Sequence, residues 1–275
     1  MKKFSFAHFL PLIVVFFLIS CDKDEETTTP PPTIVKEWSI PLSAKNEVPA
    51  PASRNEAGAA SLQLLSDNSL KYTINVTGLA AGDVLTAAHL HIGDVITSGG
   101  IVLGLNPVFT GPAASGTIVN LRSTLIDSLK SDANEIYLNV HSTGVPSGLV
   151  RGQLNTKLEM VADVPLIGAN EVPAVNTTAS GLALLRLTTD KKLYSKITVS
   201  NLDAGDALTA AHLHKAAAGA NAGILLGIYG NAAEFGTTKI ITVDDAMFTS
   251  IKTDAIYVNA HSVSRPAGLV RGQIR

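Results

Sequence analysis

The chain has 275 residues, of which 21 are Lys or Arg and 23 are Asp or Glu, and its formal net charge is −2. This balance supplies no basic patch that could neutralise phosphates, so we expect no nucleic-acid partner. The chain has one cysteine, which excludes a disulfide bond within it.

Residues 1–20 are predicted to be a signal peptide. Two lysines precede an apolar run over 9–19, which is shorter than the roughly 20 residues that a membrane-spanning helix needs. Residues 18–21, Leu-Ile-Ser-Cys, overlap the end of this run and resemble a bacterial lipobox, in which the cysteine becomes the first mature residue and carries lipid. We therefore expect Cys21 to anchor the protein in a lipid bilayer of the bacterial cell envelope, at the outer membrane, facing the periplasm or the outside. The alternative is an ordinary secretory signal with an incidental cysteine.

Residues 21–35 are predicted to form a disordered tether. The stretch after Cys21 is acidic and poor in apolar residues, and three consecutive prolines at 30–32 favour extended polyproline geometry. An acidic run at this place also resembles the surface-export signals of some bacterial lipoproteins, and the alternative is a generic solvated linker.

The rest of the chain is an internal duplication of one sequence unit. Matching motifs occur in the same order, between 120 and 124 residues apart, which predicts a duplicated domain rather than a short repeat. We expect one domain over 36–156 (copy one) and a second over 157–275 (copy two). The matching motifs are NEVPA at 46–50 and 170–174, TAAHLH at 86–91 and 209–214, IYLNVHS and IYVNAHS at 136–142 and 256–262, and GLVRGQ at 148–153 and 268–273.

Both copies are predicted to be all-β, as two tandem antiparallel β-sandwich or barrel domains with at most one short helix each. Strand-length apolar runs are bounded by Gly, Pro, Asn, Asp or Ser, and turn signals recur about every 10–15 residues. The exception is 123–132, where Leu125 and Leu129 suit a short helix capped by Ser123 or Thr124. The segment 244–254 holds the same place in copy two.

Strand alternation predicts where the histidines point. Alternate residues of a strand share a face, so His89 and His91 lie together, and His141 shares a polar face with its own neighbours. We expect the core of copy one to contain Leu90, Ile92, Leu138, Val140, Val150 and Leu154. On the opposite face we expect two clusters of histidines, His89, His91 and His141 in copy one and His212, His214 and His261 in copy two. The accompanying polar residues are Asn139, Arg151, Gln153, Asn259, Arg271 and Gln273.

Three interpretations of the histidine clusters stay open. We favour a structural hydrogen-bond network, which needs no cofactor. The second is a site for Zn²⁺ or Cu²⁺, against which stand the nearby Arg151 and the lack of acidic residues on the strand that carries His89 and His91. The third is a polar groove that recognises a ligand. The repeated acids Glu47 and Glu171 fit turn chemistry beside proline better than acid–base catalysis, which calls for a paired partner.

The motif set resembles the CHRD domain, a family first described in chordin and common in secreted bacterial proteins. The resemblance covers nearly all of copy one and copy two, although Leu149 and Leu269 stand where the family often has glutamate. In chordin these domains belong to a secreted protein that binds growth factors. The resemblance therefore implies a non-enzymatic binding or adhesion module for a protein or glycan ligand. The alternative is a metal-binding protein or a metal-dependent redox or hydrolytic enzyme.

Overall fold

The computed structural model describes Met1 and residues 30–275. Our predictions of the signal peptide, of lipidation at Cys21 and of most of the tether lie outside these residues. In the described part of the chain no helix has both the length and the apolar character to cross a membrane. Residues from Pro32 to Arg275 form one compact unit, and the boundary between the two copies at 156/157 stays a prediction.

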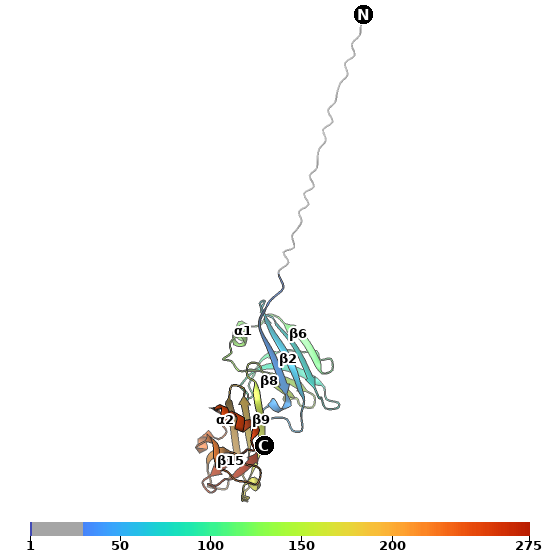
Figure 1. Cartoon of the computed structure of the whole chain (residues 1–275). Coiled ribbons are helices and arrows are strands. Elements are labelled where there is room, and N and C mark those ends of the chain that lie inside the picture. The colour runs from blue at the N-terminus through green and yellow to red at the C-terminus, as the bar shows by residue number, and fades with distance from the viewer. Residues whose placement is uncertain (2–29) are drawn as a thin grey trace. The chain divides into compact units, whose positions relative to one another are not determined.

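Each copy folds into one eight-stranded antiparallel sheet with the same strand order. Figure 1 labels β2, β6 and β8 in copy one and β9 and β15 in copy two. The order is β5-β4-β7-β8-β1-β2-β3-β6 in copy one and β13-β12-β15-β16-β9-β10-β11-β14 in copy two. The strands of copy one are β1 (Ile34–Ser43), β2 (Ala57–Leu65), β3 (Leu70–Thr77), β4 (Leu85–Ile92), β5 (Ile101–Gly104), β6 (Ala113–Ile118), β7 (Ile136–Ser142) and β8 (Val150–Gln153). Those of copy two are β9 (Leu158–Ile167), β10 (Ser180–Thr188), β11 (Lys192–Ser200), β12 (Leu208–His214), β13 (Ile224–Tyr229), β14 (Lys239–Thr242), β15 (Tyr257–Ser262) and β16 (Val270–Gln273).

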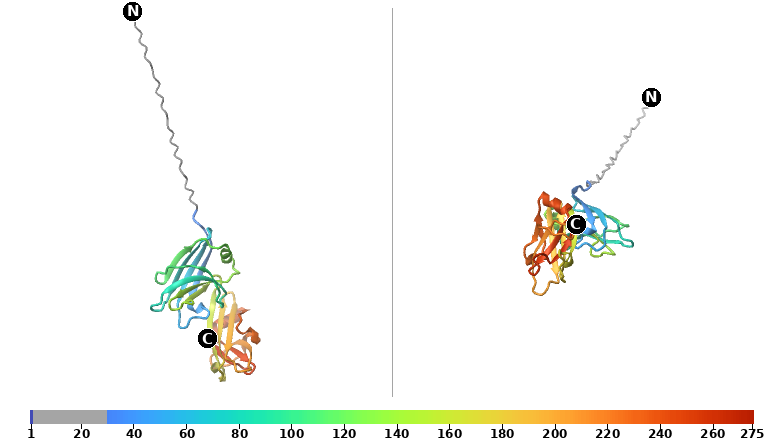
Figure 2. Two further views of the ribbon diagram at one scale, coloured as in Figure 1. Left: turned by 180° about the vertical axis from the view of Figure 1, so that it is seen from behind. Right: turned by 60° about the horizontal axis from the view of Figure 1, so that its bottom comes forward.

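The predicted fold class is confirmed. One sheet curls into a half-barrel and the other is nearly closed, and each copy carries one short α-helix. In copy two the sheet's two edge strands, β13 and β14, contact each other. The two copies take the blue-to-green and the yellow-to-red parts of the colour scale (Figure 2).

The core of copy one follows the predicted alternation with one error. Leu90, Leu138, Val140 and Val150 are fully buried and Leu154 nearly so, as predicted. Ile92 is 50% exposed, so its place in the core was wrong. It is the last residue of β4, and the pairing of β4 with β5 shifts register between Leu90 and His91. Such an irregularity breaks the two-residue alternation on which the prediction relied.

The glycine of each RGQ motif allows β8 and β16 to pass close to a neighbouring strand. A Cβ atom on Gly152 would lie 2.5 Å from Ile40 Cγ2 and closer still to the Pro41 carbonyl oxygen. Gly272 faces the Pro165 carbonyl oxygen in the same way. Because backbone atoms cannot move aside cheaply, only glycine fits at these two positions.

Both predicted helices are present, as α1 (Ser123–Lys130) and α2 (Asp245–Thr253). The predicted cap of α1 was wrong, because the residue at its N-cap is Arg122, whose side chain makes no capping bond within the described structure. Asp244 caps α2 and accepts a 2.8 Å hydrogen bond from the Met247 amide. Three short 3₁₀ turns, η1 (Ala44–Asn46), η2 (Gly168–Asn170) and η3 (Ala232–Glu234), complete the fold.

The two copies have separate apolar cores and a small shared cluster. Val95 and Ile96 of copy one pack in one buried group with Leu184 and Tyr194 of copy two. The buried Arg186 of copy two also donates a 3.0 Å hydrogen bond to the Glu47 carbonyl of copy one.

Candidate functional site

Three neighbouring strands place the motif residues in two rows across each sheet. In copy one, β4, β7 and β8 pair in register, so that His89, Asn139 and Arg151 form one row. His91, Tyr137 and Gln153 form the next row, and His141 lies opposite Ala87. The β12, β15 and β16 strands repeat the arrangement, with rows His212–Asn259–Arg271 and His214–Tyr257–Gln273, and with His261 opposite Ala210. In each copy β7 and β8, or β15 and β16, therefore pair as an antiparallel hairpin.

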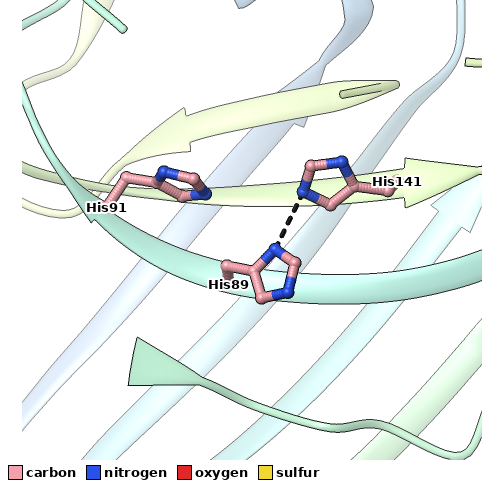
Figure 3. Close-up of side chains that lie close together, drawn as sticks. All are labelled: His89, His91 and His141. Carbon is pink, nitrogen blue, oxygen red and sulfur yellow. Dashed lines mark hydrogen bonds between the residues drawn. The ribbon is translucent and has the colours of Figure 1, made fainter. Parts of the chain in front are cut away.

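The structure brings the three histidines of each copy together, as Figure 3 shows for copy one. We call His89, His91 and His141 the first histidine cluster, and His212, His214 and His261 the second histidine cluster. In both clusters the ring centroids are 4.8, 5.8 and 6.4 Å apart. Each cluster offers three ring nitrogens that lie within 4.8 Å of one another. Two separate sheets thus build the same geometry from the same motif.

Backbone carbonyls fix how two rings of each cluster carry their protons. In copy one, His91 Nδ1 lies 2.9 Å from the Gly99 carbonyl oxygen, and His141 Nδ1 lies 3.0 Å from that of Pro146. A carbonyl oxygen only accepts, so Nδ1 of both rings must be protonated. When such a ring is neutral its Nε2 carries a lone pair, and His141 Nε2 lies 3.0 Å from His89 Nδ1. Copy two repeats this with His214 against Ala222 and Gly223 and with His261 against Pro266.

Burial keeps several of these imidazoles neutral near pH 7. It lowers the pKa of His89 and His91, with the neighbouring positive charges adding to the effect. It also lowers the pKa of His261, and that of His212 to about 4. The neutral imidazole, whose unprotonated nitrogen carries a lone pair, is the state in which histidine binds metal ions.

The arginine and glutamine of each RGQ motif hold the loop that follows the two-histidine strand. Arg151 donates to the Thr97 carbonyl at 3.0 Å and to that of Asp94, and Gln153 donates to the Gly93 carbonyl at 3.0 Å. Arg271 and Gln273 bind the carbonyls of 216–220 in copy two. This loop also carries the carbonyl that orients His91 or His214, so the RGQ residues support the clusters indirectly.

A tyrosine connects the arginine to the cluster. The His91 ring is stacked on Tyr137 with centroids 4.9 Å apart, and the Arg151 guanidinium carbon lies 3.4 Å from the centre of the same phenol ring. In copy two the ring centroids of Tyr257 and His214 are 4.7 Å apart, and the Arg271 guanidinium carbon lies 3.3 Å from the centre of the Tyr257 ring. Much of the predicted polar face is buried, including Asn139, Arg151 and Gln153 in copy one and Asn259 and Arg271 in copy two.

Glu47 and Glu171 lie nearer to the site than turn chemistry requires. Both carboxyl groups are buried, and Asn139 Nδ2 donates to Glu47 Oε2 at 3.1 Å. Burial raises the pKa of Glu47 to about 7, although the positive charge of Arg151 and the bond from Asn139 oppose the rise. The pKa of Glu171 is raised to about 7 for the same reason, against Arg271 and Asn259. The repetition of NEVP was the signal that could have placed these acids at the site.

A pocket of about 550 Å³ adjoins the first histidine cluster. His91, Glu47, Asn139 and Tyr137 are among the residues that line it. Solvent or a small ligand can thus approach the cluster from the side of the NEVP turn.

Comparison with known proteins identifies one family. The family model for the CHRD domain matches residues 38–154 and again 162–274. Chordin from Danio rerio is 27% identical over 233 residues, which are 79% of this chain and 24% of that protein. Chordin from Xenopus laevis is 25% identical over 241 residues, 82% of this chain and 25% of that protein. The chain thus spans about a quarter of the length of these relatives, and no solved structure matches it.

Proposed function

This chain belongs to the CHRD-domain family, and from that premise we propose that it is a non-enzymatic binding module for a protein, held at the bacterial cell envelope by lipidated Cys21. Membership of the family suggests a binding module. The observation that carries the proposal is the tandem match, since the family model matches both copies and both build the same motif residues into equivalent strands.

Two linked copies favour a repeated or clustered ligand. Binding of the second copy becomes intramolecular once the first has bound, which raises the apparent affinity by about 10²–10⁴ without any new contact. A tether before the first strand would let both copies reach a ligand away from the bilayer.

The binding role is tested on an array of purified envelope and extracellular proteins and glycans, each spotted densely and sparsely. We expect the intact chain to bind a protein, with apparent affinity at least tenfold higher on the dense spots. Binding to glycans alone would replace the protein by a glycan ligand. Turnover of a redox or ester substrate, abolished in His89→Ala/His212→Ala, would contradict a non-enzymatic role.

The location is tested by replacing the predicted lipidation site. In Cys21→Ser we expect most of the protein to move from the membrane fraction to the soluble fraction, because the thioether-linked lipid that holds it is lost. Thr28→Ser, a change in the tether that leaves the cysteine in place, is the matched control and should stay with the membranes. Retention of Cys21→Ser in the membrane fraction would contradict the anchor. Protease treatment of whole cells then distinguishes the outer surface from the periplasm.

A further inference from the structure

We propose that each histidine cluster binds one divalent d-block ion that prefers imidazole nitrogen, Zn²⁺ or Cu²⁺, with the three histidines of the cluster as ligands. This inference goes beyond the binding of a protein and does not depend on the lipid anchor.

The second histidine cluster holds lone pairs that face one another. Nδ1 of His214 and of His261 donates to backbone carbonyls, so Nε2 is the acceptor of each ring whenever that ring is neutral. Both Nε2 atoms lie 3.0 Å from Asn259 Oδ1, which is also an acceptor. His212 Nδ1 can donate to His261 Nε2, but His214 Nε2 and Asn259 Oδ1 are then still two acceptors 3.0 Å apart, and a cation bound among the histidines would satisfy both.

The first histidine cluster has the same excess of acceptors in a different form. His91 Nε2 and Asn139 Oδ1 are buried, and neither has a hydrogen-bond partner among residues 30–275. Buried acceptors without partners are uncommon in folded proteins and call for an ion, a water or a ligand. Their equivalents in copy two are the atoms that converge at Asn259, so both copies point to the same position.

The distances fit a transition metal. Zn²⁺ binds histidine nitrogen at about 2.0–2.1 Å, so the ligand atoms of a tetrahedral site lie about 3.3 Å apart. The ring nitrogens of each cluster already lie within 4.8 Å of one another, with one pair at 3.0 Å. Small side-chain rotations therefore close the site, and in copy one the fourth position can face the pocket beside His91.

Each cluster also has the outer support that metal-binding histidines usually have. A histidine ligand generally donates its second ring nitrogen to a carbonyl or carboxylate, which sets its tautomer. His91 and His141 both do so, and Tyr137 fixes the plane of the His91 ring. Arg151, which seemed from the sequence to oppose a cation, stacks on Tyr137 and directs its donors at Gln153 and at loop carbonyls.

Elemental analysis of the full-length chain, purified in detergent without a histidine tag, tests the site. The protein is stripped with a chelator, exposed to Zn²⁺, Cu²⁺ or Mg²⁺ in separate arms, and dialysed. We expect two equivalents of Zn²⁺ or of Cu²⁺ per chain and none of Mg²⁺, which prefers oxygen ligands. His89→Ala should reduce this to one equivalent and His89→Ala/His212→Ala to none, while the exposed change Asn75→Ala should keep two.

Two further measurements guard against variants that misfold. The Cu²⁺ form of the unaltered chain should show nitrogen hyperfine coupling from imidazole in its electron paramagnetic resonance spectrum. His91→Gln/His214→Gln, which keeps a polar side chain of similar size, should also lose both ions. Binding of less than half an equivalent by the unaltered chain in both metal arms would overturn the proposal. Undiminished binding by either double variant would do the same.

Discussion

Asp83→Ala should destabilise copy one by about 3 kcal/mol, because it removes a carboxylate that accepts hydrogen bonds from a neighbouring turn and pairs with the partly buried Arg54. Asp83 accepts hydrogen bonds from Ser142 Oγ, Thr143 Oγ1 and the Gly144 amide, all at 2.8–2.9 Å, and also binds Arg54. Its side chain is only 4% exposed. Burial alone would raise the pKa of Asp83, but the bonds from Arg54 and from the 142–144 turn hold it well below its usual value.

Copy two supplies the matched control for this change. Asp206 holds the equivalent turn through the Ser264 amide and hydroxyl, at 3.0 and 2.5 Å, but forms no ion pair within the described residues. Asp206→Ala should therefore destabilise its copy less than Asp83→Ala destabilises copy one.

The measurement can separate the two copies without dividing the chain. Trp38 is the only tryptophan, and it is buried in the core of copy one. Urea unfolding followed by its fluorescence should shift in Asp83→Ala and stay unchanged in Asp206→Ala, whose effect should appear only in circular dichroism. Equal shifts of the Trp38 transition in both variants would contradict both the separate unfolding of the two copies and the larger contribution of Asp83.

Sequence alone predicted the strands and the meeting of the histidines, because both follow from short-range rules. A two-residue alternation puts His89 and His91 on one face of their strand and places His141 on the polar face of its own strand. The duplication supplied a second copy of each motif at the same place in the unit, which distinguishes a structural motif from a chance match. The metal role of these histidines stays a prediction.

Other parts of the site could not be predicted, because they depend on contacts between distant segments. Glu47 meets Asn139 across 92 residues, and no local pattern encodes that approach. The carbonyls of Gly99 and Pro146 carry no side-chain signal, although they set the tautomers of two histidines. The exposure of Ile92 likewise results from a register shift that depends on the partner strand.

Glu47 should contribute increasing stability to copy one as the pH falls from 7 towards 4.5. Its pKa is about 7 in the folded chain and 4.5 as a reference value, so between these values the folded state holds a proton that the unfolded state has lost. Stability therefore falls as pH rises through this window, by about 1.4 kcal/mol per unit and about 3 kcal/mol in total. Below 4.5 both states are protonated and the contribution is constant.

Comparison with Glu47→Gln isolates this effect from that of the histidines. The lowered pKa values of His89 and His91 reduce stability below about pH 6.5, but they do so in both proteins and cancel in the difference. Urea unfolding is followed by Trp38 fluorescence at pH 8, 7, 6 and 5. As the pH falls, the free energy of unfolding of the unaltered chain should rise relative to that of Glu47→Gln. For Glu171→Gln, the same change in copy two, the unfolding free energy reported by Trp38 should have the same pH dependence as in the unaltered chain. A constant difference between Glu47→Gln and the unaltered chain from pH 8 to 5 would show that the carboxyl group titrates normally. In that case, the buried contact with Asn139 cannot hold a neutral acid.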